Sequence, residues 1–254
     1  MGKALLYFLL FVGITLLMVG CGTLLAGLIM SQGLYSALGI DKAEVLVYVV
    51  MVMGILWTVI ICWLFSHYKY GSLSWGILSL KQHATVLPVS ALLFLSVDIV
   101  AFWCHHLLMP FSEEYVIKMQ LFQSHPFMTL VTLLVMYVTV LVVMLSGVLR
   151  QLANAMRHKW IAMIIVAVAL SFLNLEEGGL AGLVMFGFAV ISGLIECWLY
   201  LRTRSIWPSV VGPVVGDYVL WIALSNTPQL WMGVTGIVMI PLLLYLLQHK
   251  LLRD

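Results

Sequence analysis

The sequence predicts an all-α polytopic membrane protein with about eight transmembrane helices and both termini in the cytoplasm. Three observations lead to this prediction: the composition, the number of long apolar runs, and the positions of the basic residues between those runs. Of the 254 residues, 64% are hydrophobic and 9% are charged, and the mean hydropathy is +1.15. Soluble domains carry about 25% charged residues, so most of this chain must lie within a lipid bilayer.

Eight apolar runs are long enough to cross a bilayer as helices, which takes about 20 residues each. The predicted spans cover residues 4–30, 44–66, 85–108, 127–150, 160–176, 179–201, 207–225 and 229–248. No Pro/Ser-rich linker, low-complexity tract or obvious internal repeat separates these runs, so residues 1–254 are predicted to form a single transmembrane domain. The two longest less apolar segments, 67–84 and 109–126, still contain aromatic and aliphatic residues and are expected at the membrane interface.

The basic residues alternate with the predicted spans and set their orientation. Of the twelve, ten fall on one side of the membrane: Lys3, Lys69, Lys81, Arg150, Arg157, Lys159, Arg202, Arg204, Lys250 and Arg253. The other side receives only Lys42 and Lys118. The positive-inside rule therefore places the basic side, with both termini, in the cytoplasm. A count that was wrong by one span would distribute the basic residues over both sides of the membrane. Their segregation to one side therefore supports eight spans.

The charge balance also excludes one class of partner. The net charge is +2, and no basic cluster with interleaved aromatic residues occurs, so the sequence does not predict binding to nucleic acid. The predicted partners of the chain are instead the lipids of the bilayer and another membrane protein.

Carboxyl groups occur where a bilayer disfavours them. Asp98, Glu196 and Asp217 lie within predicted spans, and Glu176 and Glu177 lie where the fifth span ends. A charge at mid-bilayer costs about 2.5–3.5 kcal/mol, so each group needs a partner, a proton or water. They either line a polar cavity between helices or act as neutral or paired residues that hold helices together. Both interpretations stay open at this point.

Arg150 belongs to the same predicted intramembrane polar cluster. Its span has no helix-breaking residue before His158, which places Arg150 about two turns inside the helix end. The side chain can extend to the cytoplasmic interface, or it can pair with a carboxylate on another helix. Asp217 and Glu176 are the expected partners for such a pair.

The residues themselves contain no recognised catalytic or metal-binding motif. HExxH, GxSxG and a phosphate-binding glycine loop with lysine are all missing from the sequence. The four cysteines lie in apolar runs without metal-ligand spacing and are expected to be buried free thiols. No metal ion and no cofactor is therefore predicted.

The turn between the sixth and seventh spans carries a family signal. Its sequence, LYLRTRSIWPSVV (199–211), resembles a stretch of the CPBP family, the CAAX-protease and bacteriocin-processing family also called Abi. In that family a Gly-rich helix ends in a Tyr-x-Arg-Thr-Gly-Ser-x-Trp-Pro turn. The resemblance covers about residues 125–225 and implies the family's bundle of eight helices, which agrees with the span count. It also implies a multi-pass protein of a bacterial plasma membrane.

Alignment of the chain with the family at this turn locates the family's three motifs in the sequence. The first is a glutamate pair and, after three further residues, an arginine; the second is a phenylalanine with a histidine four residues later. The third is a histidine with Asn or Asp four residues later. In this sequence the motif positions are occupied, in order, by Leu145, Ser146, Arg150, Phe172, Glu176, Pro213 and Asp217.

The resemblance implies a peptidase site in which the first glutamate activates water and the histidines stabilise the oxyanion. Leu145 cannot act as a base, and Pro213 offers neither a side-chain donor nor a backbone N–H. Glu176, where a donor is needed, would repel an oxyanion unless it were protonated. The sequence therefore predicts a scaffold without catalytic residues, a pseudoprotease.

Such a scaffold would bind, stabilise or regulate a membrane or cell-envelope partner, for example a cell-wall enzyme, a sensor kinase or a protein of bacteriocin immunity. The partner's helix would dock in the former substrate cavity or beside the bundle. The first alternative is an active intramembrane peptidase with a rearranged site that uses Glu176 or Glu177. A second alternative is a small transporter or channel component, in which Asp98, Glu196 and Asp217 line a path.

Overall fold

The computed structural model describes residues 76–108, 120, 122–172, 179–223 and 230–252, together with scattered positions between residues 6 and 63. Within these residues the regular structure is helical throughout. The elements are α4 (Leu80–Leu108), α6 (Pro126–Leu141), the π-helix η1 (Val142–Leu149), α7 (Arg150–Ala155), α8 (Lys159–Phe172), α9 (Gly179–Thr203), α10 (Trp207–Ala223), α11 (Leu230–Leu246) and the π-helix η2 (Leu247–Leu251). The all-α prediction is confirmed.

The predicted spans from the third to the eighth each coincide with a helix. Four helical segments are long and apolar enough to cross a membrane: Leu80–Leu108, Pro126–Ala155, Gly182–Thr203 and Trp231–His249. The first two predicted spans, 4–30 and 44–66, lie largely outside the described residues, which contribute helical positions within Gly20–Ile29 and Val52–Ile61 there. The full count of eight spans stays a prediction.

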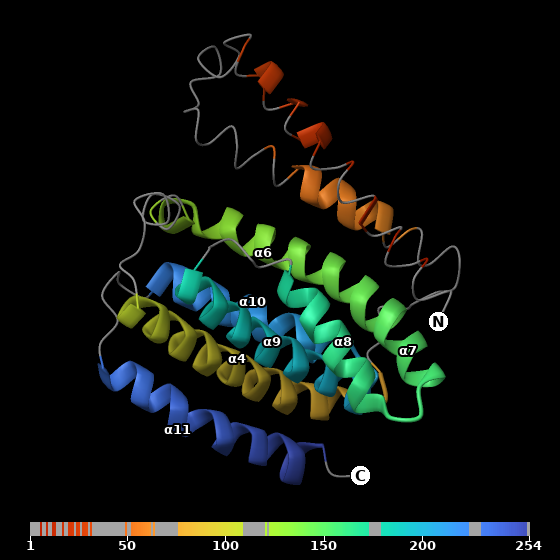
Figure 1. Cartoon of the computed structure of the whole chain (residues 1–254), viewed down its shortest axis with the longest axis vertical. Helices are drawn as coiled ribbons and strands as arrows, with labels where there is room; N and C mark the ends of the chain where they lie inside the picture. Colours follow the sequence, from red (N-terminus) through yellow and green to blue (C-terminus); the bar gives the residue numbers. More distant parts are fainter. Residues whose placement is uncertain are drawn as a thin grey trace.

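Helix α4 occupies the centre of the bundle. It packs against α9, α10 and α11, while α8 packs on α9 and α6 packs on α10. Figure 1 shows α11 on one side of α4 and α6 on the opposite side of the bundle. The described motif positions lie on η1, α7, α8 and α10.

Small residues let α10 lie directly on α4. Gly212 and Gly216 stand one turn apart on α10, and a Cβ atom at Gly212 would overlap the Phe94 ring of α4. A Cβ atom at Gly216 would overlap Asp98 Oδ2 and would lie 3.0 Å from the backbone nitrogen of Leu95. This small-xxx-small spacing is typical of closely packed membrane helices. The same spacing brings Asp98 beside α10.

A buried turn joins α9 to α10 and also holds the start of α4. Thr203 Oγ1 donates to Leu199 O (2.8 Å) and accepts from the Ser205 backbone N–H (3.2 Å), and the Ile77 N–H donates to Thr203 O (3.0 Å). Arg204, in the middle of the turn, has a φ of 55°, a left-handed conformation that favours glycine. The turn that this stretch resembles has glycine at this position, which fits the left-handed backbone that Arg204 adopts here.

Helix α4 begins five residues earlier than predicted, at Leu80 rather than at 85. Its start is a capping box: the Gln82 N–H donates to Ser79 Oγ (3.2 Å), and the Ser79 N–H donates to Gln82 Oε1 (2.9 Å). The Ser-x-x-Gln signal was present in the sequence, and the interfacial location of residues 67–84 stays a prediction.

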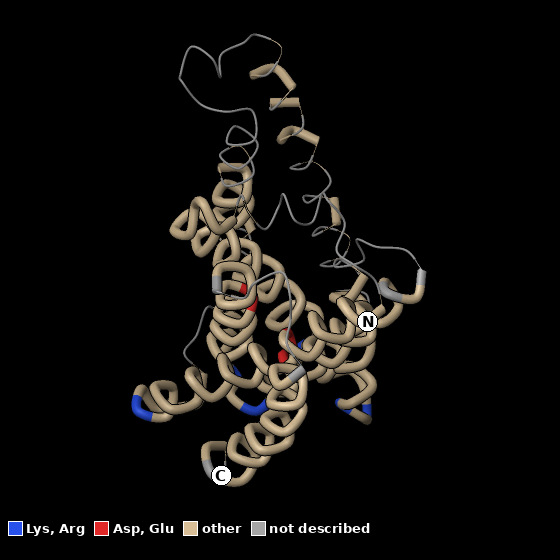
Figure 2. The backbone as a smooth tube through the Cα atoms, turned by 90° about the vertical axis from the view of Figure 1, so that its left-hand side faces the viewer, with Lys and Arg blue, Asp and Glu red and all other residues tan. Residues whose placement is uncertain are grey.

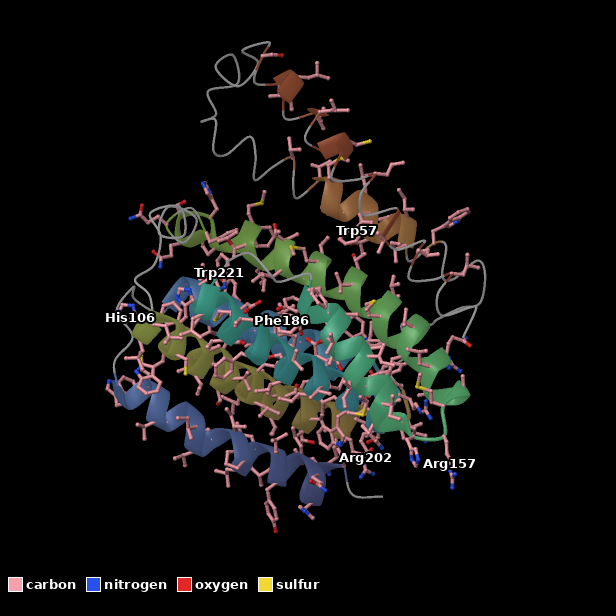
Figure 3. The ribbon with its side chains drawn as sticks, in the orientation of Figure 1. Trp57, His106, Arg157, Phe186, Arg202 and Trp221 are labelled. Carbon is pink, nitrogen blue, oxygen red and sulfur yellow. The ribbon has the colours of Figure 1, made fainter. Side chains whose placement is uncertain are left out.

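The described basic residues gather at one end of the bundle, as the alternation of charges predicted. They are Lys81, Arg150, Arg157, Lys159, Arg202, Arg204 and Lys250. Figure 2 shows them at the end of the helices that carries the α7–α8 and α9–α10 turns, with the acidic residues deeper in the bundle. Figure 3 shows Arg157 and Arg202 at this end, and His106 and Trp221 at the other. We refer to them as the basic end and the opposite end.

We predict that Gly216→Val destabilises the protein by about 1–3 kcal/mol, because the added side chain meets backbone atoms of α4 that cannot move aside. Gly187→Val is the matched control, since a Cβ atom at Gly187 meets nothing within 4 Å. Thermal unfolding of the detergent-solubilised protein measures both. Equal melting temperatures for the two variants would contradict the close α4–α10 contact.

We also predict that the basic end faces the cytoplasm. Green fluorescent protein fused after Arg157 is expected to fluoresce, and alkaline phosphatase fused after Lys118 is expected to be active, because the two reporters fold on opposite sides of a bacterial plasma membrane. The controls are alkaline phosphatase fused after Arg157 and green fluorescent protein fused after Lys118, and both are expected to be inactive. The reverse pattern of activities would overturn the orientation.

Candidate functional site

The first motif lies in a π-helical stretch that is sealed inside the bundle. All eight residues of η1 are buried, and Leu145 is 0% exposed. Leu145 belongs to an apolar cluster with Cys197 of α9 and with Val210 and Val214 of α10. Ser146 Oγ donates to Val142 O within the same helix. The two positions where the family carries its glutamate pair thus hold a packed side chain and a hydroxyl whose proton is already donated.

Arg150 follows η1 and is exposed at the basic end. Its guanidinium and that of Arg204 lie close enough to the buried Tyr200 hydroxyl to act on it electrostatically. Among the described residues, Arg150 makes no ion pair with Asp217, so the predicted pair with Asp217 is wrong. Arg150 is 13 residues beyond Tyr137, the partner of Asp217, which corresponds to about 20 Å along a helix. The other predicted partner, Glu176, lies outside the described residues.

Three carboxyl groups and one tyrosine come together deeper in the bundle. Tyr137 Oη of α6 donates to Asp217 Oδ2 of α10 at 2.6 Å. Asp98 of α4 interacts electrostatically with Asp217 and with Glu196 of α9, and Glu196 interacts with Asp217. We call these four residues the carboxyl cluster. The structure therefore brings Asp98, Glu196 and Asp217 into one neighbourhood, although each comes from a different helix.

The carboxyl cluster is incompletely hydrogen-bonded within the described residues. Asp98 Oδ2 is buried and has no hydrogen-bond partner there. Glu196 is 5% exposed, and its backbone oxygen, not its carboxyl group, accepts the hydrogen bond from Ser209 Oγ (2.9 Å). Buried polar atoms without a partner are costly, so these groups point to an additional binding element. Among the described residues, no three His, Cys, Asp or Glu side chains are arranged to hold a metal ion.

The remaining motif positions lie apart from one another. Pro213 is buried one turn before Asp217 on α10. Phe172, at the end of α8, is largely exposed and stacks edge-on against Phe186 of α9 with 5.2 Å between ring centroids. Glu176 and Glu177 lie outside the described residues. The structure therefore places Leu145, Ser146 and Pro213 in the interior, with Asp217 alone among the motif residues in the carboxyl cluster.

Sequence reasoning missed Tyr137 as a member of the cluster. The signal was a tyrosine within the apolar run TLLVMYVTVL (132–141), because a phenolic hydroxyl that is buried in a membrane needs a hydrogen-bond partner. The partner could not be read from the chain, since Tyr137 and Asp217 are 80 residues apart.

The carboxyl cluster is rich in hydrogen-bond acceptors. An ionised carboxylate only accepts hydrogen bonds, and the Tyr137 hydroxyl donates its proton to Asp217. The carboxyl cluster is therefore suited to accept donors or a cation. The buried motif positions in η1 offer neither a base nor a donor that points into it.

Comparison with known proteins agrees with the sequence resemblance. The model of the family described as type II CAAX prenyl endopeptidase Rce1-like matches residues 94–219. The match begins at Phe94 rather than near residue 125, so it includes the part of α4 that carries Asp98. No curated protein and no solved structure matches the chain. Through residues 94–219, which hold η1, the buried α9–α10 turn and the carboxyl cluster, the chain belongs to the type II CAAX prenyl endopeptidase Rce1-like family.

Proposed function

We propose that this protein is a non-catalytic member of its family, a membrane scaffold that binds, stabilises or regulates a membrane or cell-envelope partner. The observation that carries the proposal is the burial of Leu145 in an apolar cluster at the position of the family's first glutamate. Peptide hydrolysis by the mechanism of this family needs a general base beside the scissile bond and hydrogen-bond donors directed at the developing oxyanion. A leucine that is packed on all sides supplies neither.

The neighbouring positions support the same proposal. Ser146 is buried and bonds to its own helix, which leaves no free hydroxyl to orient water. Pro213 is buried and, as proline, has no N–H to offer. An active site would thus need new groups at several positions at once.

The retained motif residues have structural roles. Asp217 accepts the hydrogen bond from Tyr137 and so joins α10 to α6. Phe172 packs on Phe186 and joins α8 to α9. These contacts keep the bundle's shape, which is what a partner-binding scaffold requires. Gly187 on α9 has open space next to it, where a partner helix could approach closely.

The alternative function is an active intramembrane peptidase with a rearranged site. It is favoured by the family, which is named for endopeptidases, and its base would be Glu176 or Glu177. A peptidase assay separates this alternative from the scaffold.

We predict that the purified full-length protein does not cleave a prenylated CAAX peptide above the uncatalysed rate, because the motif positions lack a base. Mass spectrometry of the peptide after incubation in detergent or proteoliposomes measures the reaction. Glu176→Gln and Glu177→Gln are the controls and are expected to match the wild type. Cleavage by the wild type that disappears in either variant, with the fold intact, would establish the rearranged peptidase.

We also predict that the tagged protein, extracted from bacterial membranes in a mild detergent, carries a membrane or envelope protein in a constant molar ratio. Quantitative mass spectrometry of the purified complex measures the ratio. Glu176→Gln is expected to leave the recovery unchanged, since no catalysis is involved. Recovery of the chain alone, together with unchanged abundance of every envelope protein after deletion of the gene, would contradict a scaffold.

A further inference from the structure

The carboxyl cluster concentrates acidic residues where the described part of the chain supplies no basic residue. Asp98, Glu196 and Asp217 are the acidic residues of the described ranges, and they interact with one another. The described lysines and arginines lie at the basic end, near the helix termini. A site with acceptors and without a cation is complementary to a positive ligand.

Two of the three carboxyl groups retain unused hydrogen-bonding capacity. Asp98 Oδ2 is buried without a partner in the described residues, and Glu196 is 95% buried with no side-chain hydrogen bond there. Asp217 differs, because Tyr137 already donates to it. The two unpartnered groups belong to α4 and α9, so a ligand that served both would lie between these helices and α6.

Among the described residues, α6 and α9 make few contacts with each other. Helices α8 and α9 pack against η1, whereas neither packs extensively on α6, which precedes η1 in the same continuous helix. Accordingly η1 is buried throughout, while most of α6 is half-buried or exposed. Asp98, Asp217 and Tyr137 are half-buried rather than sealed. Residues Val52–Ile61 also pack on α6, where Thr58 Oγ1 donates to Val135 O (3.2 Å), so an additional helix would reach the cluster between α6 and α9.

We propose that the carboxyl cluster binds a lysine or arginine side chain at the middle of a partner's transmembrane helix. This inference rests on the proposed scaffold function and specifies the chemistry of its partner. A basic side chain supplies several donors and a compensating charge, and burial in a membrane makes such a pair selective. A bare metal ion fits less well, because the described residues provide no set of three ligands for one.

The test uses a model helix as the probe. A leucine-rich transmembrane helix of about 20 residues with one central lysine is co-expressed with the full-length chain, and the captured fraction is measured by quantitative blotting after affinity purification. The matched control helix carries methionine, which has similar length and no charge. We expect the wild-type chain to capture the lysine helix about tenfold more efficiently than the methionine helix.

Substitutions in the carboxyl cluster test which side chains cause the preference for the lysine helix over the methionine helix. Asp98→Asn and Glu196→Gln keep the side-chain shapes and are expected to abolish most of the tenfold preference for lysine. Thr235→Val removes an exposed hydroxyl on α11 that donates to Trp231 O of the same helix, away from the cluster, and is expected to retain the preference. Thermal unfolding and gel filtration of each variant establish that it is folded. If Asp98→Asn does not fold, Glu196→Gln decides the question.

Two results would overturn the inference: equal capture of the lysine and methionine helices by the wild type, or an unchanged preference in folded Asp98→Asn and Glu196→Gln variants. Recovery of the natural partner with each variant distinguishes failure of this inference from failure of the proposed scaffold function. Undiminished recovery of that partner with both variants would leave the scaffold standing and remove the basic-residue site. Selective capture of the lysine helix without any natural partner would support the site and contradict the scaffold.

Discussion

The close contact between α10 and α4 is the constraint on which the rest of the described structure depends. Gly212 and Gly216 have no side chain toward α4, so the Phe94 ring and the Asp98 carboxyl group fit directly against the α10 backbone. In a bilayer, where lipid is as apolar as leucine, such packing is a main source of helix association. It also sets the register that brings Asp98 to the level of Asp217.

The α9–α10 turn fixes this register from the basic end. Thr203, Ser205 and Ser209 are fully buried, and their hydroxyl groups bond to backbone atoms of α9 and of the turn itself. Arg204 is held in a left-handed conformation, which costs a non-glycine residue about 1–2 kcal/mol. The hydrogen bonds on both sides of Arg204, and the contact of Ile77 with Thr203 O, offset that cost.

One continuous helix, residues 126–155, divides the bundle into two environments. Its π-helical part, η1, is buried against α8, α9 and α10 and forms a mainly apolar interior around Leu145. Its first part, α6, carries Tyr137 and contributes to the carboxyl cluster. The positions that match the family's glutamate pair and the polar groups of this chain are thus separated along the same helix. The proposed scaffold needs both parts, one to hold the bundle together and one to recognise a partner.

Local and compositional features were accessible from the sequence. Apolar runs of sufficient length determined the helices, because a membrane helix satisfies its own backbone hydrogen bonds wherever it sits. The basic residues determined which helix ends share a side, and the turn LYLRTRSIWPSVV identified the family. The tertiary structure alone decided that Asp217 bonds Tyr137 and not Arg150, and that Asp98 and Glu196 join the same cluster. Those contacts join residues far apart in the chain, and they depend on how the helices are stacked and rotated, which neither hydropathy nor spacing encodes.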